Sequence, residues 1–165
     1  MAQIAFKGNP ANTVGTLPEV GTAAQPFTLT SSSLENKSLS DYQGKKVVLN
    51  IFPSVDTGIC AASVRKFNEQ ASSLDNTVVV NVSKDLPFAL NRFCASEGLS
   101  NVENLSDFRG TFGADYGVTM TDTPLQGLLS RAVVVLNEEG QVLYTEQVPE
   151  ITTEPNYEAA LNALK

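Results

Sequence analysis

The chain has 165 residues, of which 42% are hydrophobic, so it is long enough for one buried core and too short for two ordinary domains, and we expect a single domain over residues 1–165. Its net charge of -7, from 18 acidic and 11 basic side chains, argues against a nucleic-acid partner, because no basic run is present to neutralise phosphates. The first residues show no charged segment followed by a long apolar stretch, so we expect neither a signal peptide nor a membrane span, and a cytoplasmic protein.

The absence of histidine excludes more chemistry than any other count. It removes the Ser-His-Asp and Cys-His hydrolase mechanisms and the common zinc and iron sites. The two cysteines, Cys60 and Cys94, are too few for a four-thiolate metal site, but in a reducing compartment they can form a transient disulfide. We therefore expect no metal and no cofactor, and we expect thiol redox chemistry.

The first third of the chain predicts a hairpin, a loop-rich segment and one buried strand. Residues 3–14, interrupted by Gly8, Asn9 and Pro10, predict the hairpin. Residues 16–46 are rich in Pro, Gly, Ser and Thr, which indicates loops with one short strand near Phe27. The apolar run 47–52 predicts a buried strand.

The middle of the chain predicts helix, strand and helix. Apolar residues recur at spacings of three and four after Cys60, which is typical of an amphipathic helix. Residues 77–82 are β-branched and predict a second central strand. A second helix follows, with Asp85 near its N-terminus, Pro87 in its first turn and Cys94 on its inner side, and it ends near Gly98.

The last third predicts a hairpin and a final helix. Residues 133–136 and 141–144 flank the turn 137–140 and should pair antiparallel. Thr152 or Thr153 can cap a helix that begins near Pro155. Strand, helix, strand, helix, hairpin and helix together predict an α/β protein with a thioredoxin-like fold: a central mixed β-sheet flanked by helices, with an N-terminal β-hairpin.

The octapeptide 53–60, Pro-Ser-Val-Asp-Thr-Gly-Ile-Cys, joins the first central strand to the first long helix. A sulfur in the first turn of a helix faces unpaired backbone N–H groups and the positive end of the helix dipole, which favour a nucleophilic thiolate. A cysteine at a helix start is, taken alone, more often a small buried residue than a nucleophile. Position alone therefore does not assign a role to Cys60.

Pro53, Thr57 and Cys60 fit the pattern Pro-x-x-x-Thr-x-x-Cys, which resembles the active-site signature of peroxiredoxins. Further matching segments extend the similarity over essentially the full length and make the chain resemble the bacterial thiol peroxidases, which are atypical two-cysteine peroxiredoxins. These segments are 50–54, 60–68, 85–89, 92–94, 131–135 and 151–155.

This resemblance implies a thiol-dependent peroxidase that reduces hydrogen peroxide and alkyl hydroperoxides in antioxidant defence. It identifies Cys60 as the peroxidatic cysteine and Cys94 as the resolving cysteine, which closes an intramolecular disulfide, and it assigns Arg131 to the active site. It also implies thioredoxin as the reductant and a homodimer as the assembly.

The residues themselves give reasons for these assignments. Attack of a thiolate on an O–O bond requires alignment of the peroxide and stabilisation of charge on the leaving oxygen. The Thr57 hydroxyl can turn toward the sulfur or a peroxide oxygen, and Pro53 offers a rigid ring without an N–H that would shield the sulfur. Arg131 precedes a strand and can reach its end, whereas Arg65 lies about 140° around the helix from Cys60, which suits a supporting role.

Two other functions remain open from the sequence. A disulfide oxidoreductase on the same fold would need Cys-x-x-Cys, but positions 57 and 63 are Thr and Ser. A redox-sensing or binding module could use the Cys60–Cys94 disulfide as a switch for a partner. Catalytic turnover of a hydroperoxide with a thioredoxin system discriminates between the peroxidase and the switch.

Overall fold

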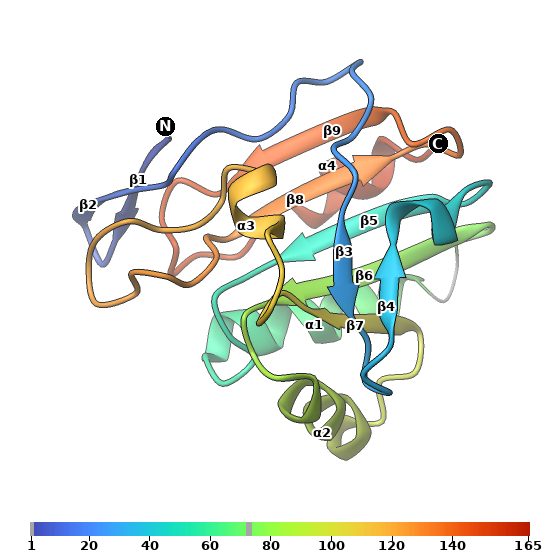
Figure 1. Ribbon diagram of the computed structural model, residues 1–165, viewed down its shortest axis with the longest axis horizontal. Helices are drawn as coiled ribbons and strands as arrows, with labels where there is room; N and C mark the ends of the chain where they lie inside the picture. Colours follow the sequence, from blue (N-terminus) through green and yellow to red (C-terminus); the bar gives the residue numbers. More distant parts are fainter. Residues whose placement is uncertain (1, 72–73) are drawn as a thin grey trace.

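The computed structural model describes residues 2–71 and 74–165, and its centre is a mixed β-sheet (Figure 1). The strand order is β4-β3-β7-β6-β5-β8-β9. Three strands at the centre run parallel: β5 (Lys46–Ile51), β6 (Thr77–Ser83) and β7 (Val102–Ser106). Helices connect these parallel strands, as such crossovers require, and the carboxyl ends of the strands therefore meet at one edge of the molecule.

Antiparallel strands extend the sheet on both sides. On one side β8 (Ala132–Leu136) pairs with β5, and β9 (Val142–Gln147) pairs with β8. On the other side β3 (Thr28–Thr30) pairs with β7 and with β4 (Asn36–Ser38), which leads into the 3-10 turn η1 (Leu39–Tyr42).

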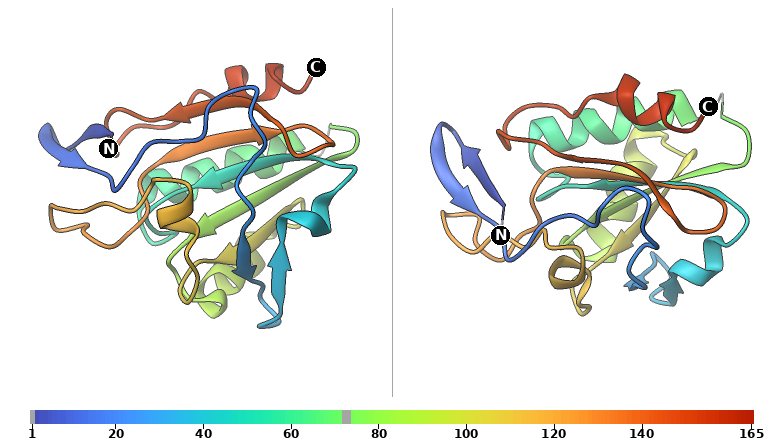
Figure 2. Two further views of the ribbon diagram at one scale, coloured as in Figure 1. Left: turned by 45° about the horizontal axis from the view of Figure 1, so that its top comes forward. Right: turned by 90° about the horizontal axis from the view of Figure 1, so that it is seen from above.

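Helices and loops cover both faces of the sheet. Figure 2 shows α1 (Gly58–Ala71) and α4 (Tyr157–Asn162) against one face, with the N-terminal segment and α3 (Phe112–Asp115) against the other. Helix α2 (Pro87–Glu97) follows β6 and packs beside β7. Alternation along β5 assigns its side chains to the two faces, because Val47 and Leu49 join the cluster beneath α3 whereas Val48 joins the cluster beneath α1 and α4.

The N-terminal hairpin, β1 (Gln3–Phe6) and β2 (Asn9–Asn12), forms a separate two-stranded sheet. Lys7 and Gly8 turn the chain with positive φ angles of 52° and 82°. The Glu150 carboxylate accepts hydrogen bonds from both of their N–H groups, at 3.2 and 2.7 Å. The hairpin is thus tied to the segment that follows β9.

The predicted hairpins, the two predicted central strands and the predicted helices are confirmed. The sequence prediction missed β4, β7 and α3, and it was wrong about the cap of the last helix. That cap is Asn156, whose side chain accepts a hydrogen bond from the Ala159 N–H at 3.0 Å, whereas Thr152 and Thr153 bond to Glu150. Among the described residues, no helix is long and apolar enough to cross a membrane.

Candidate active site

The octapeptide follows the carboxyl end of β5 and leads into α1. Pro53 is buried directly beyond the strand, and Cys60 lies in the first turn of α1 with 0% exposure. The helix begins when the Ala61 N–H donates to the Thr57 carbonyl at 3.0 Å. The sulfur is therefore close to the N–H groups of the first turn and is screened from bulk water.

Thr57 is exposed, and its hydroxyl is already committed as a donor. Its Oγ1 donates to the Ser54 carbonyl at 3.0 Å, and its N–H donates to the same carbonyl at 3.2 Å. A hydroxyl that gives its proton away keeps its lone pairs for accepting another hydrogen bond. Thr57 can thus accept from the O–H of a hydroperoxide.

Asp85 holds this loop in place, a role that sequence reasoning missed. Its carboxylate accepts hydrogen bonds from the Ser54 hydroxyl at 2.7 Å, the Val55 N–H at 2.9 Å and the Ser83 hydroxyl at 2.7 Å. We expected Asp85 near the start of α2, and it is, but the capping position is Leu86, which makes no side-chain cap. Ser54 and Val55 are remote from Asp85 in the sequence, so no local pattern pointed to these two contacts.

Arg131 reaches the same edge of the sheet from β8. The register pairs Ile51 with Ala132, which sets Arg131 beside the end of β5 where the octapeptide begins. Arg131 is only 2% exposed, and its Nε donates to the Ile151 carbonyl at 2.7 Å. Its Nη1 is buried without a hydrogen-bond partner among the described residues, which is costly for a guanidinium and leaves a donor free for a ligand.

Tyr157, at the start of α4, is a further neighbour of this site. Burial raises the pKa of Tyr157 most, and the hydrogen bond to Glu154 raises it further. The charges of Arg131 and Cys60 also act on the Tyr157 pKa, in opposite directions, so both groups lie within electrostatic range of its hydroxyl. The tyrosine ring packs edge-on against Phe67 of α1, with ring centroids 5.1 Å apart.

Cys94 lies on α2, and it packs in the same apolar cluster as Cys60. It is 6% exposed, and both cysteines are free thiols. Burial raises the pKa of the Cys94 thiol, and a side-chain hydrogen bond with Asn104 offsets part of that effect. The structure therefore brings both thiols into one apolar environment between α1, α2 and the sheet.

Arg65 does not join the cysteine site. It forms a 2.6 Å ion pair with Glu97 on α2, and its guanidinium lies 5.6 Å from the centre of the Phe93 ring. It connects the outer surfaces of α1 and α2.

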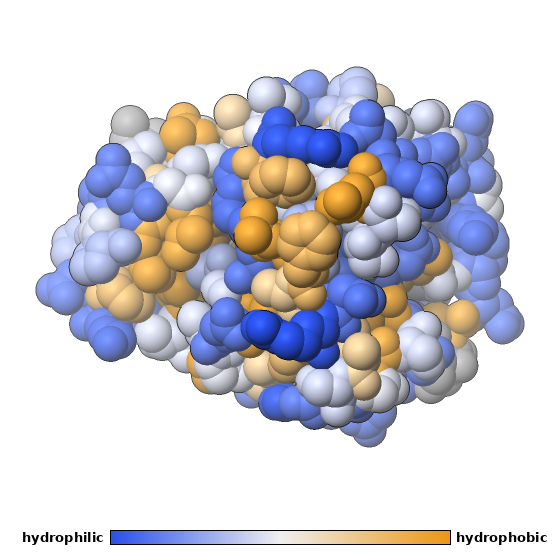
Figure 3. Space-filling view, turned by 60° about the horizontal axis from the view of Figure 1, so that its bottom comes forward, coloured by the Kyte–Doolittle hydropathy of each residue, from blue (hydrophilic) through white to orange (hydrophobic). Residues whose placement is uncertain are grey.

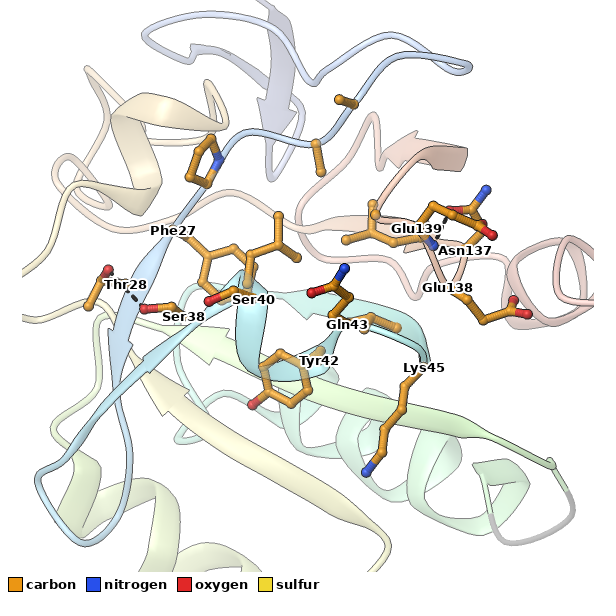
Figure 4. A pocket seen from close by; sticks show the side chains of 17 residues that line it. Phe27, Thr28, Ser38, Ser40, Tyr42, Gln43, Lys45, Asn137, Glu138 and Glu139 are labelled. Atoms are coloured by element: carbon orange, nitrogen blue, oxygen red, sulfur yellow. Dashed lines mark hydrogen bonds between the residues drawn. The ribbon is translucent and has the colours of Figure 1, made fainter.

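A cavity of about 370 Å³, shown in Figure 4, lies at the end of the sheet away from Cys60. Phe27, Tyr42 and Val47 contribute to its wall, together with the turn between β8 and β9. Val47 stands near the amino end of β5, whereas Cys60 follows its carboxyl end. None of the five predicted site residues lines this cavity.

Comparisons with known proteins identify the family of the chain. A model of the Redoxin family matches residues 19–161. The chain is 57% identical to a thiol peroxidase of Corynebacterium glutamicum over 164 residues, covering 99% of both chains. It is 58% identical, over the same length and with the same coverage, to a thiol peroxidase of Mycobacterium tuberculosis.

Solved structures show the same architecture. A peroxiredoxin-like protein from Aquifex aeolicus superposes with a TM-score of 0.93 at 38% identity, covering 98% of this chain and 95% of that chain. A thiol peroxidase from Chromobacterium violaceum, at 22% identity and a TM-score of 0.91, shares the fold over 98% of this chain and 94% of that chain. The chain therefore belongs to the Redoxin family and, within it, to the bacterial thiol peroxidases, which are thiol-dependent peroxidase enzymes.

Proposed function

We propose that Cys60 is the peroxidatic cysteine of this peroxidase and that it reduces hydrogen peroxide and alkyl hydroperoxides. The observation that carries the proposal is that one sheet edge holds both a buried thiol in the first turn of α1 and the Arg131 Nη1, which has no hydrogen-bond partner in the described part of the chain. In the reaction the Cys60 thiolate attacks one peroxide oxygen and the O–O bond breaks. The sulfur becomes a sulfenic acid, and the leaving oxygen takes a proton and departs as water or an alcohol.

The neighbouring residues have separate tasks in this step. The Thr57 hydroxyl, held by the Ser54 carbonyl, accepts from the peroxide O–H and aligns it. Arg131 donates to the oxygen on which negative charge grows, and a fixed donor at such a position is worth about a hundredfold or more in rate. Pro53 is buried and has no N–H, so it shields the sulfur from water.

We propose that Cys94 resolves the sulfenic acid. The Cys94 sulfur bonds to the Cys60 sulfur, the S–O bond breaks, and the oxygen leaves as water with the thiol proton. The shared apolar cluster supports this pairing. Because a disulfide needs Cα atoms within about 7 Å, the first turn of α1 would unwind if the two cysteines lie farther apart.

A thiol reductant must then reduce the disulfide, and we propose thioredoxin for this step. Helix α2 carries apolar surface on the face shown in Figure 3, and Leu86 and Phe88 at its N-terminus are 50% and 62% exposed. This surface adjoins Asp85 and hence the octapeptide loop, which suits the approach of a protein reductant. We also propose that the protein is a homodimer, which light scattering tests by measuring its molar mass in solution.

The experiment is turnover of a hydroperoxide by wild type and by two cysteine variants with a thioredoxin system. Cys60→Ser should abolish peroxide consumption. Cys94→Ser should still consume about one equivalent and then stop, because the sulfenic acid forms and has no partner. Peroxide turnover by Cys60→Ser would overturn the assignment, and disulfide formation without turnover would favour the redox switch instead.

A further inference from the structure

Three asparagines form a ladder across the centre of the sheet. Strands β5, β6 and β7 each carry the pattern Val-x-Asn, at 48–50, 79–81 and 102–104. The register aligns them, so that Asn50 pairs with Asn81 and Asn81 with Asn104. The ladder therefore lies on the sheet face beneath α1 and α2, the two helices that carry the cysteines.

The amides of the ladder all point the same way. Asn50 Nδ2 donates to Asn81 Oδ1 at 3.0 Å, and Asn81 Nδ2 donates to Asn104 Oδ1 at 3.1 Å. Asn104 Oδ1 accepts from Asn81, so the ladder itself does not use the Asn104 NH2 group. The ladder thus fixes the orientation of this amide and leaves its NH2 group as the donor for a neighbouring acceptor.

The other end of the ladder reaches the helix that carries Cys60. Asn50 Nδ2 also lies 3.4 Å from Ser63 Oγ, whose hydroxyl donates to the Cys60 carbonyl at 2.8 Å. Asn50 and Asn81 are 1% and 0% exposed. Asparagine is disfavoured inside strands and costly to bury without partners, whereas the aligned valines show that this face accepts apolar residues.

The position of Cys94 places it next to the last amide. Helix α2 packs on β7, and Cys94 belongs to a cluster against which Val102 packs. Asn104 is two residues further along the same strand and so points to the same face. Burial raises the pKa of the Cys94 thiol, and the neighbouring Asn104 side chain acts in the opposite direction with a smaller effect.

The charged groups around Cys94 are turned to other partners or to water. Arg65 of α1 and Glu97 of α2 pair with each other on the surface, and Glu103 of β7 accepts from the Tyr42 hydroxyl. The remaining titratable side chains on α1, α2 and the loop before α1 are the buried Cys60 and the exposed Asp56, Lys66, Glu69 and Arg92. A hydrogen-bond donor is therefore the local means of stabilising a Cys94 thiolate.

We propose that Asn104 is a catalytic residue of the resolving step, which donates a hydrogen bond to the Cys94 sulfur and favours its thiolate, and that Asn50 and Asn81 are positioning residues that fix its orientation. The proposal rests on the disulfide mechanism proposed above. Only the thiolate attacks the sulfenic sulfur, so the donor increases the fraction of Cys94 that can react.

The test titrates Cys94 by itself. In Cys60→Ser, Cys94 is the only thiol, and its thiolate is followed by ultraviolet absorbance against pH, with Cys60→Ser/Cys94→Ser subtracted as the tyrosine background. Adding Asn104→Leu should raise the titration midpoint enough to lower the thiolate fraction at neutral pH by about tenfold. Asn104→Ala, which introduces no new contact, should also raise the midpoint, and it replaces the leucine variant in the test if that variant does not fold.

A control separates this effect from loss of a buried polar contact. Asn50→Leu removes the far end of the ladder but leaves the Asn81 to Asn104 hydrogen bond, so it should shift the midpoint less than Asn104→Leu does. An unchanged or lowered midpoint with both Asn104 variants would overturn the proposal, because an oxygen facing Cys94, or no contact at all, predicts those results.

A second readout follows the reaction. After a stoichiometric hydroperoxide pulse, Asn104→Leu should form the Cys60–Cys94 disulfide about threefold more slowly than wild type at neutral pH, because the higher nucleophilicity of a more basic thiolate offsets part of the loss. At a pH above both midpoints the order should reverse, because both thiols are then fully ionised and the more basic thiolate is the better nucleophile. If wild type forms no disulfide, the proposed resolving role of Cys94 fails, and the titration still reports on Asn104.

Discussion

The Ser54 hydroxyl donates a 2.7 Å hydrogen bond to the Asp85 carboxylate, and this contact joins the octapeptide 53–60 to the segment that precedes α2, the helix that carries Cys94. Ser54 also provides the carbonyl that fixes the Thr57 hydroxyl. A carboxylate between β6 and α2 therefore controls where the proposed peroxide-binding threonine stands.

The substitution Asp85→Asn should slow oxidation of Cys60 by hydroperoxide about tenfold or more, because small misplacements of a reacting group are costly. The new NH2 group would replace either Oδ1, which now accepts from the Ser54 hydroxyl, or Oδ2, which now accepts from the Val55 N–H and the Ser83 hydroxyl. Rapid-mixing kinetics measure the rate, and amide exchange at Ser54 to Thr57 should rise. Asp56→Asn removes a charge from the exposed side of the same loop and should leave the rate near wild type. Equal rates for both variants would contradict the positioning role.

Arg131→Lys should reduce the rate of Cys60 oxidation by about a hundredfold. Lysine keeps the positive charge but loses the planar fork that holds the Ile151 carbonyl with one nitrogen and offers another to the site. The control is Arg109→Lys, since Arg109 contacts the Leu34 carbonyl and Asn36 beside β4. A rate close to wild type in Arg131→Lys would show that charge alone suffices.

Glu150 should make the N-terminal hairpin sensitive to acid. Hydrogen bonds from Thr152 and Gly8, with smaller help from Lys7, lower the pKa of Glu150 to about 2. Because this pKa is depressed on folding, the stabilisation is complete above the ordinary carboxyl pKa and is lost as the pH falls toward about 2.

Nuclear magnetic resonance tests this prediction through the Gly8 amide, which donates to Glu150 Oε1 at 2.7 Å. Its chemical shift should titrate with a midpoint near 2 in wild type, and Glu150→Gln should abolish that titration. Glu139→Gln, in the exposed turn before β9, should leave the Gly8 titration unchanged. A Gly8 midpoint at the ordinary glutamate value would contradict the prediction.

Asn156→Ala should lower the free energy of unfolding by about 1 kcal/mol, because it removes the side-chain cap of α4. Urea unfolding measures the loss, and amide exchange should increase at Ala159. Thr153→Ala removes a hydroxyl that bonds to the Glu150 carbonyl and should leave α4 exchange unchanged. If amide exchange in α4 increased in Thr153→Ala and not in Asn156→Ala, Thr153 would be the cap, as expected from the sequence.

The sequence by itself determined the elements whose side chains repeat in a regular way. The β-branched runs of β5 and β6 predict central strands, and the apolar stripe beyond Cys60 predicts α1. Local geometry also predicted that Cys60 stands in the first turn of a helix. These features depend on residues close together in the chain, which is why pattern and spacing were enough.

Tertiary structure alone decided the rest. Strand β7 reads Val-Glu-Asn-Leu-Ser and has no strong strand pattern, but it is stabilised by pairing with β6 and β3 on its two sides. The same pairing aligns Asn104 with Asn81, and the β5–β8 register brings Arg131 to the octapeptide. Hydrogen bonds between residues remote in sequence depend on the relative position of strands. The packing of the whole sheet sets this relative position, so it cannot be predicted from any short segment of the chain.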